Sequence, residues 1–558
     1  MRGSLLACAA FACLVACAPS WKQTPHDERF QRAAAPRLHP RPAPESLPTD
    51  WWDRMTSSTV LPLGHLVSPG YYASGALGGR DALDVNRLGE VPDSTWFENR
   101  IGRRALTPGE IERGPGDWTA PAPGPLTVIS GKLEGATPGL VLRDSTGRVF
   151  YAKVDPPAFR ELSTGAEIVA QRLLHAAGYL VPDMQLLDLS LERLVLDPHA
   201  TRLNSYRQLV PMTREHLREL ISNLNPTSSY RLRTLVSLST PGESMGPFSY
   251  RGIRADDPND RIAHERRRSL RGLWVFAAWL SNTDVRRQNT LDSFVVVDAR
   301  RHLGYVRHNL IDFGNSLGAA GERDKYRGEG YEEEFDWPAI GLRLLATGLR
   351  YDDWSLLRSS PYPSVAIFEA KLFEPEGWRP NYPNPAFDEA TAEDTFWAAS
   401  ILARLDRAAI TAAVRAARYS DPRAARYIID VLMARRAKML AYAFTGLLPL
   451  VDPTVSGHRV AMTDLAPRRG AGYRHLVRWD RTGRGDQELA RGDSPTPSVD
   501  LAPAIARARQ LDASGFAADP FLTITWWRPR GSESGPRVEL HLRVQGDHLI
   551  PVGLWREH

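Results

Sequence analysis

Cysteine is nearly absent from the sequence, and its few occurrences lie at the start of the chain. The 558 residues include three cysteines, Cys8, Cys13 and Cys17. A fold built from the rest of the chain therefore cannot contain a disulfide, a cysteine nucleophile or a cysteine metal site. Its stability must come from the burial of apolar side chains, which a hydrophobic content of 42% at this length allows.

The sequence also lacks a second long apolar run and a strong excess of one charge. Beyond residue 17 no stretch approaches about eighteen uninterrupted apolar residues, so no membrane-spanning helix is predicted. The net charge of +5 is small for this size and is spread along the chain, which argues against a nucleic-acid partner. The length predicts roughly two to four domains.

The first seventeen residues form a secretory signal. Arg2 supplies a positive charge, and Leu5 to Ala16 is almost wholly apolar but too short to span a bilayer. The segment Leu14-Val15-Ala16-Cys17 resembles the bacterial lipobox, in which a small residue precedes a cysteine that is acylated before cleavage. This resemblance implies removal of residues 1–16 and a lipid on Cys17 that tethers the chain to a membrane. The alternative is an ordinary secretory peptide.

Two segments precede the part of the chain with regular patterns. Residues 17–50 are rich in Pro, Arg and Ala, a composition that predicts an extended tether. Residues 51–124 are broken by Pro and Gly and are interpreted as an N-terminal extension. A lipid on Cys17 would leave the folded part facing the periplasm or the cell surface. Ala18 favours the outer membrane, because an Asp there would suggest retention at the inner membrane.

From Pro125 onward the sequence predicts strands followed by helices. The predicted strands of this block are 126–130, 139–143, 148–154, 184–187 and 233–238. Between them lies a helix in which Thr164 and Glu167 form a capping box and which ends near Gly178 and Pro182. A polar insert before the last strand includes a second helix near 213–223.

The second half is predicted to be mainly helical, with a β-rich end. Predicted helices cover 264–280, 393–418 and 421–442, and short strands lie at 294–297 and 304–311. Residues 446–558 alternate like strands around an Ala-rich helix, which predicts a separate β-rich C-terminal domain. The predicted fold class is therefore α+β.

Four polar signals occur in order along these elements. Lys153 ends a strand, Glu167 lies in the next helix, Asn282-Thr-Asp284-Val-Arg286-Arg-Gln-Asn289 follows the helix 264–280, and Asp312-Phe-Gly314 follows a hairpin. The pattern resembles the catalytic loop and the Asp-Phe-Gly motif of the protein-kinase-like superfamily. Without His-Arg-Asp or Ala-Pro-Glu, it is most similar to the atypical branches, the HipA-like and phosphatidylinositol kinases.

The resemblance covers residues 125–445 and implies a two-lobed core. A β-rich N-lobe (125–242) and a helical C-lobe (243–445) would hold ATP and Mg²⁺ between them. The implied roles are the following: Asp284 orients the acceptor, Arg286 lies near the γ-phosphate, Lys153 pairs with the α and β phosphates, Glu167 positions Lys153, Asn289 and Asp312 hold magnesium, and Gly131 and Gly135 cover the phosphates.

Alternatives stay open for single residues and for the whole chain. Capping by Thr164 explains Glu167 about as well as an ion pair with Lys153 does, and Lys153 could face solvent on its strand. The chain could be a phosphotransferase, an enzyme that transfers AMP, or an inactive scaffold of the envelope whose C-terminal domain recognises a protein or polymer partner. An exported enzyme would meet little ATP, and the sequence does not identify its acceptor.

Overall fold

The chain forms two units, which are seen in a computed structural model. The residues that it describes are 35–45, 55–56, 59, 81–116, 120–131, 139–204, 208–224, 231–321, 323–334, 336–346, 352–467, 472–482, 484–530 and 533–557. The predicted lipidation site, Cys17, and the predicted loop glycine Gly135 lie outside these residues. One unit holds Val85–Pro92 and Phe444–His558, and the other holds Asp93–Ala443 with the described part of 33–84.

The fold class is α+β, as predicted. We expected the C-terminal domain to begin at residue 446, and the two units divide between Ala443 and Phe444. Residues 125–443, which include nearly all of both expected lobes, belong to a single unit, so the two-lobed arrangement stays a prediction. None of the described helices is long and apolar enough to cross a membrane.

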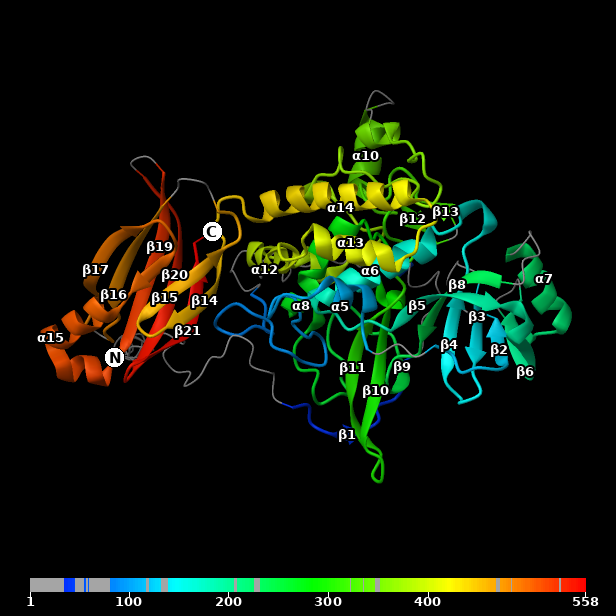
Figure 1. Cartoon of the computed structure of the whole chain (residues 1–558), viewed down its shortest axis with the longest axis horizontal. Helices are drawn as coiled ribbons and strands as arrows, with labels where there is room; N and C mark the ends of the chain where they lie inside the picture. Colours follow the sequence, from blue (N-terminus) through cyan, green and yellow to red (C-terminus); the bar gives the residue numbers. More distant parts are fainter. Residues whose placement is uncertain are drawn as a thin grey trace, which may run out of the picture. The chain divides into compact units, whose positions relative to one another are not determined.

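The larger unit contains a seven-stranded sheet, drawn in cyan and green in Figure 1. The strand order is β5-β8-β4-β3-β2-β6-β7, and β2 and β6 are its one parallel pair. Its strands are β2 (Leu126–Gly131), β3 (Gly139–Arg143), β4 (Val149–Lys153), β5 (Met184–Ser190), β6 (Leu194–Leu203), β7 (Leu209–Pro211) and β8 (Arg231–Leu238). The five predicted strands are present, whereas β6 and β7 arise from the polar insert and are not predicted from the sequence.

One face of this sheet is apolar, and helix α7 (Arg214–Leu224) packs against it through Leu217. Successive side chains of a strand point to opposite faces. In β4 the buried Phe150 and Ala152 belong to this apolar core, so Tyr151 and Lys153 face the other way. This alternation places Lys153 on the side of the sheet that carries helix α6 (Ser163–Ala177).

Helix α6 is buried along almost its whole length, but the predicted capping box at its start is wrong. Thr164 is a helical residue, and the N-cap residue Leu162 has no side-chain cap. Instead, the Asp155 carboxylate accepts hydrogen bonds from the backbone N–H groups of Ser163 and Thr164, at 3.0 and 2.9 Å. A charged acceptor satisfies these amides better than a hydroxyl does. Glu167 is therefore not needed for capping.

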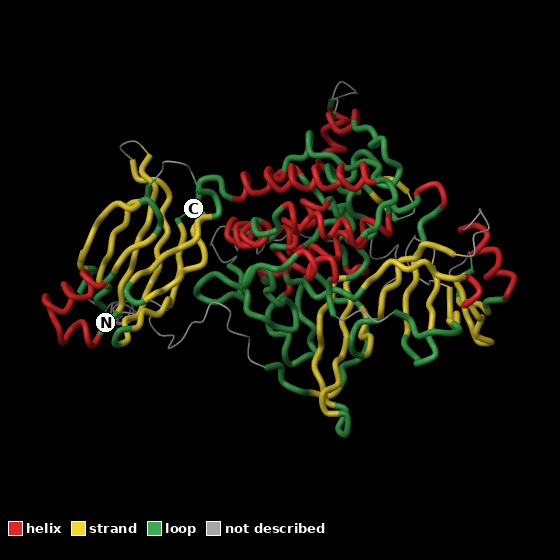
Figure 2. Tube along the Cα trace, viewed as in Figure 1, coloured by secondary structure: helices red, strands yellow, loops and turns green. Residues whose placement is uncertain are grey.

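The rest of the larger unit combines helices with a four-stranded antiparallel sheet in the order β1-β11-β10-β9. Its strands are β1 (His39–Pro40), β9 (Glu243–Gly246), β10 (Thr290–Asp298) and β11 (Leu303–Leu310). A separate two-stranded sheet consists of β12 (Ala319–Ala320) and β13 (Arg323–Asp324). The helices are α5 (Pro108–Arg113), α8 (Arg268–Arg271), α9 (Leu273–Leu280), α10 (Trp337–Leu345), α11 (Pro385–Asp388), α12 (Ala392–Leu402), α13 (Arg407–Ala416) and α14 (Pro422–Ala443). Figure 2 shows these helices in red.

Two long predicted helices are each interrupted. The segment 264–280 consists of a short 3-10 turn (His264–Arg266), α8 and α9, with Gly272 between the two α-helices. A Cβ atom at Gly272 would lie 2.7 Å from the Trp397 ring, so this position packs too tightly for a side chain. The segment 393–418 is split into α12 and α13, because the Asp406 side chain accepts from the N–H of Ala409 and starts a new helix.

The described part of the predicted tether, residues 35–45, is bound to the folded unit. Strand β1 pairs with β11, His39 opposite Gly304. Arg41 forms an ion pair with Glu243 at 3.0 Å, and His39 Nε2 lies 3.3 Å from a carboxylate oxygen of Asp257. These residues are therefore not part of a free tether, because strand pairing and ion pairs outweigh their polar composition.

The C-terminal residues fold as a β-rich unit with one helix. Its five-stranded sheet has the order β17-β16-β19-β20-β21, and its three-stranded sheet has the order β14-β15-β18. The elements are β14 (Leu450–Ser456), β15 (Arg459–Asp464), β16 (Tyr473–Trp479), β17 (Gln487–Ser494), β18 (Ser498–Asp500), α15 (Ala502–Ala518), β19 (Phe521–Arg530), β20 (Glu533–Gln545) and β21 (His548–Arg556). Both sheets and α15 contribute to one buried core that includes Trp479 and Trp526.

Candidate functional site

Lys153 is the centre of an ion-pair cluster at the end of β4. Its Nζ donates to both carboxylate oxygens of Glu167, at 2.8 and 2.9 Å, and to Oδ1 of Asp312 at 2.9 Å. Glu167 comes from α6, and Asp312 comes from the loop after β11. Three segments that are distant in the sequence therefore meet at one amine. The structure brings together three of the residues that the motifs single out.

The cluster is buried on one side and open on the other. The Glu167 side chain is 1% exposed, whereas that of Asp312 is 35% exposed. Burial alone lowers the pKa of Lys153, but the charges of Asp312 and Glu167 outweigh this effect and hold the pKa above its ordinary value. Lys153 is therefore a cation at neutral pH, held in a fixed position beside a partly exposed carboxylate.

The segment that carries Asp312 has an unusual backbone. Asp312 has a φ of 56°, in the left-handed region that residues other than glycine seldom adopt. The preceding residue, Ile311, is held in place because its N–H donates to the carbonyl of Asn289 at 3.0 Å. A Cβ atom at Gly314 would lie 2.7 Å from the Ser163 hydroxyl, so the glycine lets this segment approach the start of α6. Strained residues of this kind cluster at functional sites.

The loop with Asp284 and Asn289 begins where α9 ends. Ser281 has a φ of 52° and turns the chain out of the helix, and the N–H of Asn282 donates back to the carbonyl of Ala277 at 2.8 Å. At the other end, Nδ2 of Asn289 donates to the backbone carbonyl of Asp284 at 2.6 Å. This bond closes the loop and fixes the orientation of the Asn289 amide relative to Asp284.

Arg286 lies beside Asp284 within the same loop. Its Nε is 2.8 Å from Oδ1 of Asp284, and its guanidinium carbon lies 5.0 Å from the centre of the Tyr382 ring. The aromatic face and the carboxylate together hold the cation in place. Arg286 therefore acts on the charge of Asp284 directly, a contact that the sequence does not predict.

One cavity collects the polar residues of both motifs. Its polar wall includes Asn282, Asp284, Asn289 and Asp312. Apolar side chains and one tyrosine form the rest: Leu174, Tyr250, Leu273, Ala277, Leu280, Val285, Leu310, Ile311 and Phe313. Two carboxylates and two carboxamides therefore converge in a partly apolar cavity that adjoins Lys153 through Asp312.

The residues of the cavity fit a hard cation that arrives with its ligand. Among the described residues, no group of three or more His, Cys, Asp or Glu side chains is arranged to hold a metal ion. Mg²⁺ usually keeps several waters and binds one or two carboxylates together with substrate phosphates. Asn289 and Asp312 offer oxygen atoms to the same cavity, which suits a phosphate-bound ion rather than a site made of protein ligands alone.

The predicted glycine loop receives no support from the described residues. Gly131 ends β2, and a Cβ atom added there would meet only Arg202 of β6, at 3.5 Å. Gly131 is not among the residues that line the cavity with Asp312. Gly135, as stated above, lies outside the described residues. A role for the two glycines over a phosphate stays a prediction.

Several residues around the site are missed by sequence reasoning. Asp155 fixes the start of α6 and thereby the position of Glu167, and Tyr250 lines the cavity. Lys325 donates to the carbonyl of Ser281 and, at 3.0 Å, to the hydroxyl of Thr283. The contacts of Lys325 join segments more than forty residues apart, and the spacing of Asp155 from α6 matches no capping motif, so local patterns do not reveal these residues.

Comparisons with known proteins give little beyond a distant similarity to a kinase. No family model matches the chain, and no curated protein matches it. Among solved structures, the chain is similar to two crystal structures of the Golgi casein kinase, one of them with Mn/ADP bound. Each match has 12% identity and a TM-score of 0.24 and covers 58% of this chain, with 74% and 72% of the other chains. Similarity at this level carries no argument, so the function is argued from the geometry.

Proposed function

We propose that this protein is an ATP- and Mg²⁺-dependent phosphotransferase with a kinase-like core at residues 125–445. One observation carries the proposal: Lys153 bridges Glu167 and Asp312, and Asp312 shares a cavity with Asp284 and Asn289. Phosphoryl transfer depends mainly on positioning and on neutralising the charge of the phosphates. A fixed cation, two oxygen-bearing metal ligands and a carboxylate near the acceptor are the parts that it needs.

Each residue has a role that its contacts support. Lys153 is a cation at neutral pH and would bind phosphate oxygens, while Glu167 holds its amine in place and Asp155 fixes the start of the helix that carries Glu167. Asn289 and Asp312 would hold magnesium, which supplies the charge that neutralises the phosphates. Asp284 would orient the acceptor hydroxyl. The N-lobe at 125–242 and the C-lobe at 243–445 would enclose the nucleotide.

Arg286 would act at the same place as Asp284. Its contact with the Asp284 carboxylate at 2.8 Å holds that carboxylate in a fixed orientation. A phosphate group entering the cavity would compete with Asp284 for the guanidinium, which places the cation between the carboxylate and the transferred group. The identity of the acceptor is not part of this proposal.

We also propose that a lipid on Cys17 tethers the protein to a bacterial membrane, on the side facing away from the cytoplasm. The support is the lipobox-like segment that ends at Cys17. In cells that express the full chain, a Cys17→Ser variant should leave the membrane fraction and lose labelling by an alkyne fatty acid. Equal labelling and equal membrane recovery of the two proteins would refute the lipid tether.

Binding of the nucleotide is tested by the unfolding temperature of the full chain in Mg-ATP. Millimolar Mg-ATP should raise this temperature, because a ligand that binds only the folded state stabilises it. Asp312→Ala should remove the rise. Asp298→Asn is the matched control, because Asp298 is an acidic residue whose side chain accepts from the N–H groups of Arg300 and Arg301 in a hairpin turn.

Two outcomes would lead away from phosphotransfer. If Mg-ATP does not change the unfolding temperature of the wild-type chain, the nucleotide proposal is wrong and a binding or scaffold role is left. If binding is present, incubation with ATP labelled at the γ-phosphate should label an acceptor or the protein itself. Label transferred from the α-phosphate instead would identify an enzyme that transfers AMP.

A further inference from the structure

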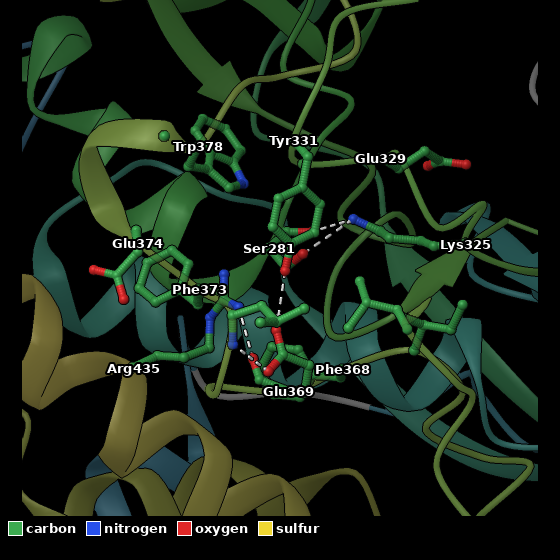
Figure 3. Close-up of a pocket in the computed structure, with 15 residues that line it drawn as sticks. Ser281, Lys325, Glu329, Tyr331, Phe368, Glu369, Phe373, Glu374, Trp378 and Arg435 are labelled. Atoms are coloured by element: carbon green, nitrogen blue, oxygen red, sulfur yellow. Dashed lines mark hydrogen bonds between the residues drawn. The ribbon is translucent and has the colours of Figure 1, made fainter. Parts of the chain in front are cut away.

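A second cavity lies on the other side of the loop that carries Asp284. Figure 3 shows this cavity, which Lys325, Tyr331, Trp378 and Arg435 enter from different segments. Ser281 lines it, whereas Asn282 and Asp284 line the first cavity, and no residue lines both. It is therefore a separate site that begins at the same loop.

Two cations in its wall are buried without a carboxylate partner. Lys325 and Arg435 are each 4% exposed, and among the described residues neither forms an ion pair. The hydrogen bonds of Arg435 go to backbone carbonyls, those of Ala278, Trp279 and Glu369, at 2.5 to 2.9 Å. Its guanidinium carbon also lies 3.6 Å from the centre of the Phe373 ring in the wall. Buried charges are normally paired, so two unpaired cations in one wall call for an explanation.

A third donor in the wall has no partner at all. Trp378 is 2% exposed, and its indole Nε1–H has no hydrogen-bond acceptor among the described residues. In Figure 3 the Trp378 ring lies across the cavity from Lys325 and above Arg435. Indole, guanidinium and ammonium groups can only donate hydrogen bonds. Lys325 and Arg435 already donate to carbonyl and hydroxyl oxygens, so a bound group would have to supply an acceptor for the indole and negative charge for the two cations.

The acidic residues of the wall do not supply these acceptors, because each has its own donors. Glu329 accepts from Arg323 and Glu374 from Lys438, at 3.2 and 2.8 Å. The two oxygens of the Glu369 carboxylate accept from the Tyr331 hydroxyl and from the N–H of Leu372. The donors to Glu369 are neutral, so its charge offsets one of the two cations, and the charge left over in the cavity is still positive.

We propose that this second cavity binds a small oxyanion, a phosphate or carboxylate group, through Lys325, Arg435 and the indole N–H of Trp378. The aromatic rings of Phe373 and Tyr331 would form its sides. This site does not depend on the proposed nucleotide site. It does lie next to it, because Lys325 donates to Ser281 and Thr283 at the start of the loop with Asp284.

The charge of Lys325 should respond to the anion. Burial, with smaller contributions from the charges of Arg435 and Arg323, lowers the pKa of Lys325 to about 7, although the charges of Glu329 and Asp284 oppose this shift. An anion in the cavity would favour the charged amine, so binding should take up a proton. The affinity for acetate, which is fully ionised throughout this range, should therefore be higher at pH 6 than at pH 8.

Calorimetric titration of the full chain with inorganic phosphate, and separately with acetate, tests the site. The probe that binds more tightly indicates whether the natural ligand carries a phosphate or a carboxylate group. Trp378→Phe keeps the ring and removes only the N–H, and Lys325→Met keeps the stem and removes the charge. Each should weaken binding about tenfold or more, since a hydrogen bond to a charged group is lost.

The control is Lys371→Met, which removes an exposed cation that adjoins the wall residue Leu372 in the sequence but does not line the cavity; its affinity should stay within about twofold of wild type. Asp312→Ala should also bind the anion normally, which separates this result from failure of the nucleotide site. Absence of binding for both anions at tens of millimolar would overturn the proposal. Wild-type affinity in the Trp378→Phe variant, which keeps the core packed, would also overturn the proposal.

Discussion

Replacing Lys153 with methionine tests the energetic role of the ion-pair cluster. Methionine keeps an unbranched side chain of similar length and removes the ammonium group that Glu167 and Asp312 share. Asp312 is partly exposed and can be solvated, but Glu167 is 1% exposed and would keep its charge without a partner. An unpaired buried charge costs roughly 3–5 kcal/mol of folding free energy.

The pH dependence follows from the raised pKa of Lys153. Because this pKa lies above the unfolded value of 10.5, the stabilisation is fully present below pH 10.5 and is lost as the pH rises through the folded pKa. At pH 7 the variant should therefore show the whole deficit. The deficit should shrink at acid pH, where protonation of Glu167 removes the unpaired charge.

The assay is urea denaturation of the full chain at pH 7, with hydrogen exchange of α6 peptides to locate the effect. Glu167→Gln leaves Lys153 paired with Asp312 and should cost less, roughly 1–3 kcal/mol. The double variant leaves no buried charge without a partner. Its loss of folding free energy should therefore be smaller than the sum of the two single losses by roughly 1–3 kcal/mol. Additive losses would refute the claim that the two groups act as a pair. Lys438→Met, a surface ion-pair control, should cost less than about 1 kcal/mol.

Three further predictions concern other parts of the chain. Gly272→Ala should lower the stability by roughly 1–3 kcal/mol and loosen Trp397, measured by denaturation and tryptophan fluorescence, because the new Cβ would overlap the ring. Burial, aided by the charge of Asp388, raises the pKa of Glu333 to about 7, so stability should fall as the pH rises from 4.5 to 7. Glu333→Gln should remove that fall and unfold at a higher temperature than wild type at pH 8, with equal unfolding temperatures at pH 4.5. Thr523→Val should cost about 1–3 kcal/mol, seen by hydrogen exchange in the C-terminal unit, because the buried Asp480 loses a hydroxyl donor.

The elements that the sequence predicts well are those with strong local patterns. The strands at 126–131, 139–143 and 149–153 are short, mainly apolar runs between turn signals, and the structure contains all three. Helix α6 is predicted from its apolar spacing. Its capping is not, because the group that caps it, Asp155, lies outside any local capping motif and reaches the helix through the loop between them.

The remaining errors come from tertiary contacts that override local preference. Within 264–280, Gly272 packs against Trp397, more than a hundred residues later in the chain, a contact that local spacing does not predict. Residues 35–45 have the composition of a tether, yet β1 pairs with β11. Strands β6 and β7 form from a polar insert because a sheet edge is available to pair with them.

The site shows the same difference between residues found from local patterns and residues that only the fold brings together. Lys153, Asp284, Asn289 and Asp312 are identified by motif order, because each motif keeps its own spacing along the chain. The cluster of Lys325 and Arg435 carries no such spacing. Its members meet only through the fold, so the second cavity could not be predicted from the sequence.

Chemical labelling with an acyl-phosphate derivative of ATP tests the nucleotide site most directly. Such a reagent acylates a lysine amine that lies beside the bound phosphates, and this chain has only six lysines to distinguish by mass spectrometry. In the presence of Mg²⁺, the account predicts that Lys153 is the lysine labelled, that excess ATP prevents the labelling, and that Asp312→Ala reduces it. Labelling of other lysines alone, or labelling of Lys153 that excess ATP does not prevent, would contradict it.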